Sequence, residues 1–393
     1  MRRLQKLNNS EIFFDISKHS LNKYGEELCG DNVEIFKSKN RMIIVLADGL
    51  GSGVKANILS TLTTKIAGTM LQNESSIEET MNTIINTLPV CKMRKVAYST
   101  LGIIQIDENN NATIIEYDNP PVFFKRDNQI LELKKEELYF SDKKVKITKI
   151  PLRIGDTMTL VSDGVVHAGV GQILNQGWKW ENIADFLKKQ SKNNSETYNR
   201  SLIDACNKLY IEKPGDDTTS VTLMIKKPQV TNIFTGPPEN KDKDSEIIES
   251  FISQEGKKIV CGGTAANIFS REMDKEITTS FDYIDKEVPP IADIEGLDLV
   301  TEGILTLKKL LSKLEFLKNS TDEYNFEKKD GATLLAKILV TESTHINIWF
   351  GRAVNPAHQN PDLPIDLSIK LNILGKISNL LKSLGKEVSF KYL

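Results

Sequence analysis

In the first half of the chain, segments with the apolar pattern of β-strands alternate with segments whose apolar residues recur at helical spacing. Residues 42–47 and 157–161 are short apolar runs, as expected for strands that are buried on both faces. Apolar residues at helical spacing predict helices at 55–72, 76–88, 180–190 and 195–209. Asn- and Asp-containing turns separate many of the predicted strands, so we expect antiparallel pairing and an α+β fold. The predicted strands are 11–16, 33–36, 42–47, 96–106, 112–118, 121–125, 130–134, 157–161 and 220–226.

The pattern changes at Lys227-Pro228. Residues 235–244 are rich in proline and charge, which is typical of a linker or an exposed loop. Beyond them, helices at 245–255, 264–273 and 303–315 alternate with strands at 257–261 and 297–300, as in an α/β domain. A chain of 393 residues usually forms more than one domain. We therefore predict a first domain at 1–228, a linker at 229–244 and a smaller α/β domain at 245–393.

Composition excludes several classes of function. The chain has 51 Lys+Arg against 53 Asp+Glu, so no overall positive charge favours nucleic acid or an acidic membrane as a partner. Its four cysteines, Cys29, Cys91, Cys206 and Cys261, lack the spacing of a zinc site or a disulfide framework. No apolar run approaches the length of a membrane span, and the first twenty residues lack the apolar core of a signal peptide. We expect a cytoplasmic protein.

Aspartates lie beside glycines at four places, and each pair comes at one end of a predicted strand. Carboxylates that are distant in sequence but gathered by the fold are what hard divalent cations require, and glycine permits the tight turns between them. Asp48 follows a buried strand and precedes a long helix, so it is the best candidate for a bridging ligand. The pattern predicts a two-metal hydrolase. The four places are Gly30-Asp31, Asp48-Gly49, Asp163-Gly164 and Gly215-Asp216-Asp217.

Four motifs give these aspartates a family resemblance. They are CGDN at 29–32, ADGLGSGVKA at 47–56, VSDG at 161–164 and GDDTTSV at 215–221. In this order and spacing, residues 24–226 resemble the metal-dependent protein phosphatases of the PPM/PP2C superfamily, in particular the bacterial SpoIIE-type branch. The resemblance implies a PP2C-like β-sandwich flanked by helices, two Mn²⁺ or Mg²⁺ ions and a third ion in some relatives.

The resemblance also implies a role for each matching residue. Asp48 would bridge the metals, Gly49 would be a ligand through its carbonyl, and Asp163 and Asp216 would complete the pair. Asp31 would lie outside these ligands or near an additional metal. Asp217 stands where relatives have Asn or Asp, and its role stays open. Asp48, Asp163 and Asp216 would be the catalytic residues for hydrolysis of phosphoserine or phosphothreonine in a protein substrate, by a water that the two metals acidify.

Some positions depart from the family pattern or allow another interpretation. Leu50 stands where many eukaryotic relatives have a histidine that is thought to protonate the leaving alcohol, so the leaving-group acid is unidentified. His167 follows Asp163 by four residues, although an ordinary surface histidine is the simpler interpretation. Glycines at 49–53 suggest a nucleotide loop, but Val54 and Ala56 break the dinucleotide and P-loop patterns. The helices at 55–72 and 76–88 correspond to a switching element in SpoIIE-type relatives, or they simply cover the sheet.

The second half carries a candidate ligand site of its own. Gly262, Gly263 and Thr264 resemble an anion-binding turn at a helix start. Arg352, Asn355 and His358 lie in a second loop that is dense in hydrogen-bonding groups, and a small ligand could bind where the two loops converge. The alternative is that both are tight turns. Apolar stretches at 303–318 and 369–384 could form a homodimer interface, or more simply core.

We recognise no family for residues 229–393. The leading hypothesis is a phosphatase that the carboxy-terminal domain regulates. One alternative is a non-catalytic module that binds phosphoproteins, and another is a sensor of a ligand or of redox state that has a phosphatase as its output.

Overall fold

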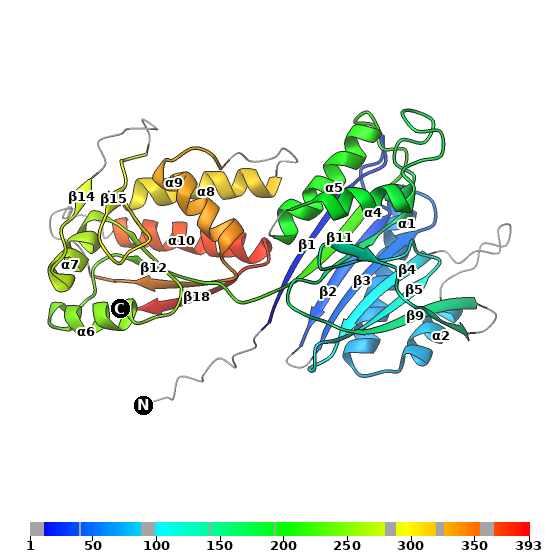
Figure 1. The fold of residues 1–393 in the computed structure, drawn as a ribbon, viewed down its shortest axis with the longest axis horizontal. Coiled ribbons are helices and arrows are strands. Elements are labelled where there is room, and N and C mark those ends of the chain that lie inside the picture. The colour runs from blue at the N-terminus through cyan, green and yellow to red at the C-terminus, as the bar shows by residue number, and fades with distance from the viewer. Residues whose placement is uncertain are drawn as a thin grey trace. The chain divides into compact units, whose positions relative to one another are not determined.

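The computed structural model describes residues 12–38, 41–87, 99–140, 143–191, 194–279, 288–319, 326–353 and 365–393. They form two compact units, one of Phe14–Lys226 and one of Lys227–Leu393 together with the described residues up to Phe13. Figure 1 shows the helices and strands of both units, many of them labelled.

The first unit is built on two sheets. All strand pairs of the six-stranded sheet are antiparallel, and a Cβ placed on Gly102 of this sheet would lie 3.3 Å from Leu160 of the other, so the two sheets pack face to face. The six-stranded sheet has the order β2 (Asp31–Lys37), β3 (Met42–Gly49), β4 (Ser99–Ile106), β5 (Asn111–Tyr117), β9 (Lys143–Pro151) and β8 (Glu136–Phe140). The five-stranded sheet has the order β1 (Phe13–Leu21), β11 (Thr218–Lys226), β10 (Thr157–Val161), β6 (Phe123–Arg126) and β7 (Gln129–Leu131).

Helices cover the outer face of each sheet of the first unit. Ala67, Leu71 and Met81, from α1 (Gly53–Gln72) and α2 (Ile77–Thr87), share one apolar cluster with the six-stranded sheet. The short α3 (Asp163–Val166), α4 (Trp180–Lys189) and α5 (Ser195–Leu209) share another with the five-stranded sheet. The expectation of an α+β fold with flanking helices is confirmed.

The second unit has one mostly parallel sheet of seven strands. Its order is β14 (Thr278–Thr279), β15 (Ala292–Asp293), β16 (Leu299–Thr301), β13 (Lys257–Cys261), β12 (Val230–Thr235), β17 (His345–Phe350) and β18 (Glu387–Tyr392). The last five strands of this order are parallel. The expected α/β region is therefore present.

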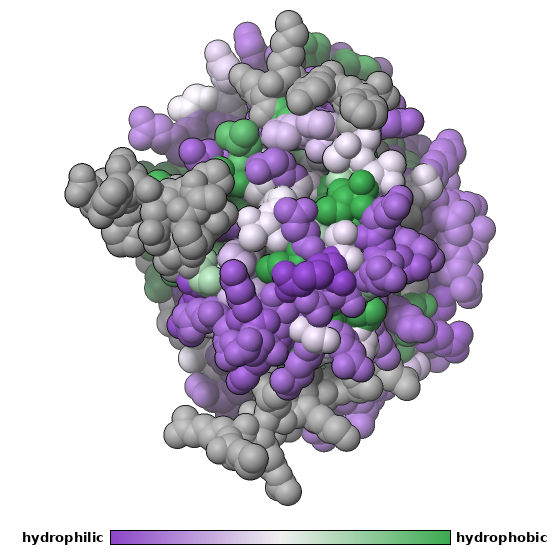
Figure 2. All heavy atoms as spheres, turned by 90° about the vertical axis from the view of Figure 1, so that its left-hand side faces the viewer, coloured by the Kyte–Doolittle hydropathy of each residue, from purple (hydrophilic) through white to green (hydrophobic). Residues whose placement is uncertain are grey.

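Helices pack on both faces of this parallel sheet. α6 (Asp244–Ile252) and α7 (Gly263–Met273) form one apolar cluster with it. α8 (Ile304–Asn319), α9 (Gly331–Lys337) and α10 (Ile365–Ser383) form the other. Short turns, η1 (Lys241–Lys243) and η2 (Ile338–Glu342), precede α6 and follow α9. Figure 2 shows one end of this unit, where the surface is mostly hydrophilic with a few separate apolar spots.

The expected linker at 229–244 is wrong for its first half. Val230–Thr235 forms β12, which has β13 and β17 as neighbours and is buried over most of its length. Only the part around η1 is an irregular connection. The sequence pattern missed this strand because Thr231 and Asn232 interrupt the apolar run. The asparagine is nevertheless fully buried, since its amide donates to the Glu255 carbonyl at 2.9 Å.

The apolar sides of α8 and α10 lie in the core. Leu310 and Leu314 of α8 and Leu374 and Ile377 of α10 are buried in the same cluster, which accounts for the amphipathic stretches at 303–318 and 369–384. In the described ranges, no helix combines the length and the apolar character that a membrane crossing needs.

Candidate metal centre

Two of the predicted aspartates face each other across neighbouring strands. Asp31 begins β2, Asp48 is the penultimate residue of β3, and the two are direct partners in the antiparallel register. The Gly49 N–H donates to the Gly30 carbonyl at 3.2 Å and holds the ends of these strands together. The pairing places Asp31 of the CGDN motif beside Asp48 of the ADGLGSGVKA motif.

The other sheet brings the remaining aspartates to the same place. Asp163 lies two residues after the end of β10, and Asp216 and Asp217 directly precede β11, its antiparallel partner. Ser162 and Thr219 fasten these turns, because the Ser162 N–H donates to the Thr219 carbonyl and the Thr219 N–H donates to Ser162 Oγ, each at 2.9 Å. The structure therefore brings together all four predicted aspartates, with Asp217 beside them.

Glycines in these motifs allow close approach of neighbouring backbone. A Cβ on Gly49 would lie 2.1 Å from the Ala56 carbonyl oxygen of α1, and one on Gly164 would lie 2.1 Å from the Asp217 carbonyl oxygen. A Cβ on Gly30 would come within 2.8 Å of Asp217 Oδ2. No side chain fits at these three positions without displacing its neighbour.

The gathered carboxylates raise one another's pKa. Burial, followed by the charges of Asp31 and Asp163, raises the pKa of Asp48 to about 10. Burial raises the pKa of Asp31 to about 7 with a contribution from Asp217, although the Ser162 and Thr219 hydroxyls oppose the shift. The pKa of Asp216 is also raised, by burial and then by Asp163. The protein alone therefore does not stabilise the ionised state of these groups.

Buried oxygens without hydrogen bonds test whether a cation fits here. Both carboxylate oxygens of Asp31 and Oδ2 of Asp217 are buried and have no hydrogen-bond partner among the described residues. Unsatisfied anionic oxygens beside further carboxylates are the donor set that Mg²⁺ and Mn²⁺ prefer. Within the described ranges, no three His, Cys, Asp or Glu side chains stand ready to hold one ion. The chemistry of the donors fits a divalent cation.

Several residues around this centre were not singled out from the sequence. The Lys23 N–H donates to Asp217 Oδ1 at 3.0 Å, so Asp217, only 3% exposed, is fixed more firmly than expected. The Tyr210 hydroxyl donates to the Gly164 carbonyl at 2.7 Å and supports the turn at Asp163. Burial raises the pKa of Cys29 to about 12. Lys23 and Tyr210 lie outside the four aspartate motifs, and only tertiary structure reveals them.

His167 lies at the rim of the centre. Its Nδ1 is 3.9 Å from Asp163 Oδ2, and its side chain is 56% exposed. Leu50 is partly buried. Neither position identifies a leaving-group acid.

The candidate ligand loops of the second unit are described only in part. Gly262 caps the start of α7, which includes Gly263 and Thr264. Arg352 lies just after β17, where it pairs with Glu239 at 3.3 Å and lies over the Tyr392 ring. Asn355 and His358 lie outside the described residues. The convergence of the two loops is therefore still a prediction.

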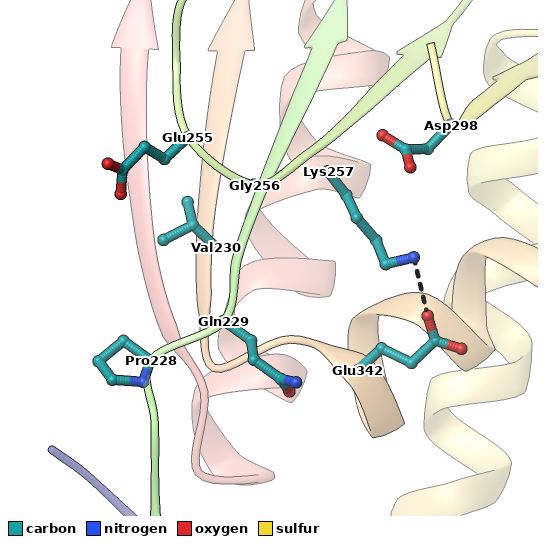
Figure 3. A pocket seen from close by; sticks show the side chains of 8 residues that line it. All are labelled: Pro228, Gln229, Val230, Glu255, Gly256, Lys257, Asp298 and Glu342. Atoms are coloured by element: carbon teal, nitrogen blue, oxygen red, sulfur yellow. Dashed lines mark ion pairs between the residues drawn. The ribbon is translucent and has the colours of Figure 1, made fainter. Parts of the chain in front are cut away.

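A cavity of about 320 Å³ lies in the second unit, at the starts of β12 and β13. Its lining includes Val230 at the start of β12 and Lys257 at the start of β13. Lys257 points across the cavity to Glu342, with Nζ and Oε2 3.1 Å apart (Figure 3). Glu255 points away from this ion pair (Figure 3). None of the residues predicted from the sequence to bind a ligand lines this cavity.

Comparison with known proteins relates most of the first unit to a protein family. Residues 38–226 match the family model described as stage II sporulation protein E (SpoIIE). A search of curated proteins found no match.

Several solved structures have similar folds. The phosphatase domain of SpoIIE from Bacillus subtilis is 20% identical, with 55% of this chain and 94% of that chain covered and a TM-score of 0.44. RsbX in complex with magnesium is 22% identical, with 54% and 96% covered and a TM-score of 0.40. The S. agalactiae serine/threonine phosphatase is 15% identical, with 54% and 99% covered and a TM-score of 0.41.

Proposed function

Because residues 38–226 form a domain of the SpoIIE family, which is PP2C-like, we propose that this chain is a metal-dependent protein serine/threonine phosphatase. The observation that carries the proposal is the meeting of aspartates from both sheets, with buried oxygens that have no hydrogen bond in the described part of the chain. A module that only binds phosphoproteins would have no need to bury unpaired carboxylates, because they would repel a phosphate.

In this proposal Asp48, Asp163 and Asp216 would hold two Mn²⁺ or Mg²⁺ ions, with Asp48 as the central ligand. The Gly49 carbonyl is a further ligand, and Asp31 serves an outer position or an additional ion. The crowding that raises the pKa of Asp48 supports its central place, since its neighbours are Asp31, Asp163 and Asp216. Bound metal would supply an acidified water as nucleophile and would neutralise charge on the phosphoryl oxygens.

The residues of the chain itself position these groups. Ser162 and Thr219 hold the two turns that carry Asp163, Asp216 and Asp217 at a fixed distance. The Lys23 N–H donates to Asp217 and holds its carboxylate in place, and the nearby Lys23 side chain lowers the pKa of Asp216 against the effect of burial. The substrate in this proposal is a phosphoserine or phosphothreonine on a protein, and the second unit regulates its hydrolysis.

A metal titration tests the proposal. We expect the full chain to hydrolyse p-nitrophenyl phosphate and a phosphoserine peptide only when Mn²⁺ or Mg²⁺ is present. Asp48→Asn should lower turnover by at least about 100-fold, because a metal ligand matters no less than the groups that orient ligands. Asp185→Asn, which changes an exposed aspartate of α4, is the matched control and should turn over normally.

Two results would contradict the proposal. One is a wild-type chain that binds Mn²⁺ but shows no turnover, which would favour a non-catalytic module. The other is an Asp48→Asn variant with undiminished metal-dependent turnover. Comparison of residues 1–228 with the full chain tests regulation separately, since equal activity would remove the second unit from the proposal.

A further inference from the structure

The strand order of the second unit marks one edge of its sheet as a binding edge. From β12 the chain proceeds through β13 to β16 on one side and then returns to β17 and β18 on the other. These five strands are parallel, so their carboxyl ends lie along the same edge. In open α/β sheets, ligands bind outside the carboxyl ends of the strands, near the place where the order reverses.

Two helices begin side by side at this edge. α7 follows Gly262, and α8 follows Gly303. The Gly262 N–H donates to the Thr301 carbonyl at 2.8 Å, and a Cβ on Gly303 would lie only 3.4 Å from the Gly262 Cα. A Cβ on Gly263 would meet no atom within 4 Å, so space is open above the first turn of α7. The N-terminal turns of two helices, with their positive dipole ends, therefore lie together.

A partly buried lysine adds a full positive charge. Lys370 of α10 is partly buried, which lowers its pKa, and the groups whose charges oppose this shift are Cys261 and Glu302, at the ends of β13 and β16. Burial keeps the Cys261 thiol neutral by raising its pKa to about 11, and Glu302 is exposed to water. The described residues include no carboxylate that forms an ion pair with Lys370. A partly buried ammonium of this kind calls for an anion.

An unpaired hydroxyl is an independent sign of a missing partner. Thr306, in the first turn of α8, is 0% exposed, and its Oγ1 has no hydrogen-bond partner among the described residues. Side chains of a helix lean toward its N-terminus, so this hydroxyl leans toward the turn at Gly303 and the adjoining Gly262. Buried hydroxyls are normally hydrogen-bonded, and an acceptor is absent here.

We propose that the carboxyl ends of β13 and β16, the starts of α7 and α8, Lys370 and Thr306 bind the phosphate group of a small molecule. A phosphate has several acceptor oxygens, so it can accept from the N–H groups of both helices, from the lysine and from the hydroxyl at once. The site lies wholly within the second unit and uses none of the aspartates of the first.

Binding to the full-length, metal-free protein tests this site. Chelator removes metal, so that the aspartates of the first unit repel phosphate and do not compete as a binding site. Calorimetric titration with inorganic phosphate and with AMP should show saturable binding of one or both. Binding of phosphate alone would indicate the free ion, and tighter binding of AMP would indicate a phosphorylated small molecule.

Variants assign the binding to the proposed residues. Lys370→Met should weaken binding about tenfold or more, because it removes a charged hydrogen-bond donor. Thr306→Val keeps the shape and should weaken binding severalfold. Lys376→Met, an exposed lysine of the same helix, and Asp48→Asn should leave it unchanged. In the proposed function Asp48→Asn lowers turnover, but it should not affect phosphate binding by the second unit. The failure of one proposal can therefore be distinguished from the failure of the other.

The proposal is overturned if the wild-type protein binds neither phosphate nor AMP saturably. It is also overturned if Lys370→Met and Thr306→Val bind as tightly as the wild type. Should Lys370→Met fail to fold, the isosteric Thr306→Val decides alone, and undiminished binding by that variant refutes the site.

Discussion

Gly49→Ala is the sharpest test of how the candidate metal centre is built. A Cβ at this position would lie 2.1 Å from the Ala56 carbonyl oxygen and 2.7 Å from its carbonyl carbon. Carbon and oxygen atoms in proteins approach to about 3.3 Å, so the first turn of α1 or the turn at Asp48 has to move by about 1 Å. The obstacle is helix backbone, and no change of rotamer relieves it.

The expected cost follows from this geometry. Overpacking of a tight core costs about 1–3 kcal/mol and occasionally more, and we expect the upper end because backbone must shift. The gain from a less flexible unfolded chain is only about 0.4–1 kcal/mol. Gly49→Ala should therefore lower the free energy of unfolding by about 2 kcal/mol and weaken the affinity for Mn²⁺, because the Gly49 carbonyl moves.

Urea unfolding followed by tryptophan fluorescence measures the effect. A Trp349→Phe background leaves Trp178 and Trp180, both in the first unit, as the reporters. Gly215→Ala is the matched control, since this glycine also adjoins a predicted ligand but its Cβ would meet only Tyr210, at 3.5 Å. If Gly49→Ala is as stable as the control and binds Mn²⁺ equally well, the tight contact between α1 and the Asp48 turn is refuted.

Three further predictions concern charges. Metal-free Asp48→Asn should unfold at higher urea than the metal-free wild type, because it relieves the crowding with Asp31 and Asp163; a lower midpoint would contradict this. Arg126→Leu should cost about 3–5 kcal/mol in urea unfolding, since it leaves Asp156, 1% exposed and bound at 2.8 and 2.7 Å, without its partner; a cost below about 1 kcal/mol would mean that water replaces the arginine. Glu196→Gln should cost about 1–3 kcal/mol at neutral pH, because Glu196 accepts from Arg200 and contacts His19. Burial raises the pKa of Glu196, but His19 and Arg200 outweigh it and hold that pKa below 4.5, so the stabilisation is present above pH 4.5 and lost as the pH falls through the folded pKa. Melting curves of wild type and Glu196→Gln should therefore converge in acid, and a difference that is constant with pH would rule out the charge as its cause.

The sequence predicted the aspartate cluster because each member is tied to local features. Asp48 follows an unbroken apolar strand, and the glycines mark turns where backbones approach. The sequence could not predict which strand ends meet, so Lys23, 194 residues from Asp217, was missed. The raised pKa of Asp48 likewise depends on burial and on neighbours from both sheets.

The second unit was harder to predict because its strands have mixed composition. β12 carries a buried Asn232, and β18 lies at the edge of the sheet with four of its six residues exposed, so neither has a continuous apolar run. α9 is only 7 residues long, too short for a helical period to be evident. Burial of polar residues through hydrogen bonds, as between Asn232 and Asn347 at 3.1 Å, is decided by tertiary structure.

The position of β12 has a practical consequence for cutting the chain. β11 ends at Lys226 and β12 begins at Val230, so Lys227, Pro228 and Gln229 are all that separates the two sheets. A truncation after residue 244, the end of the linker expected from the sequence, would leave β12 without β13 and β17. An unpaired strand with exposed Ile233 and Phe234 is prone to intermolecular pairing, so such a fragment should aggregate where a fragment that ends at residue 228 stays dispersed.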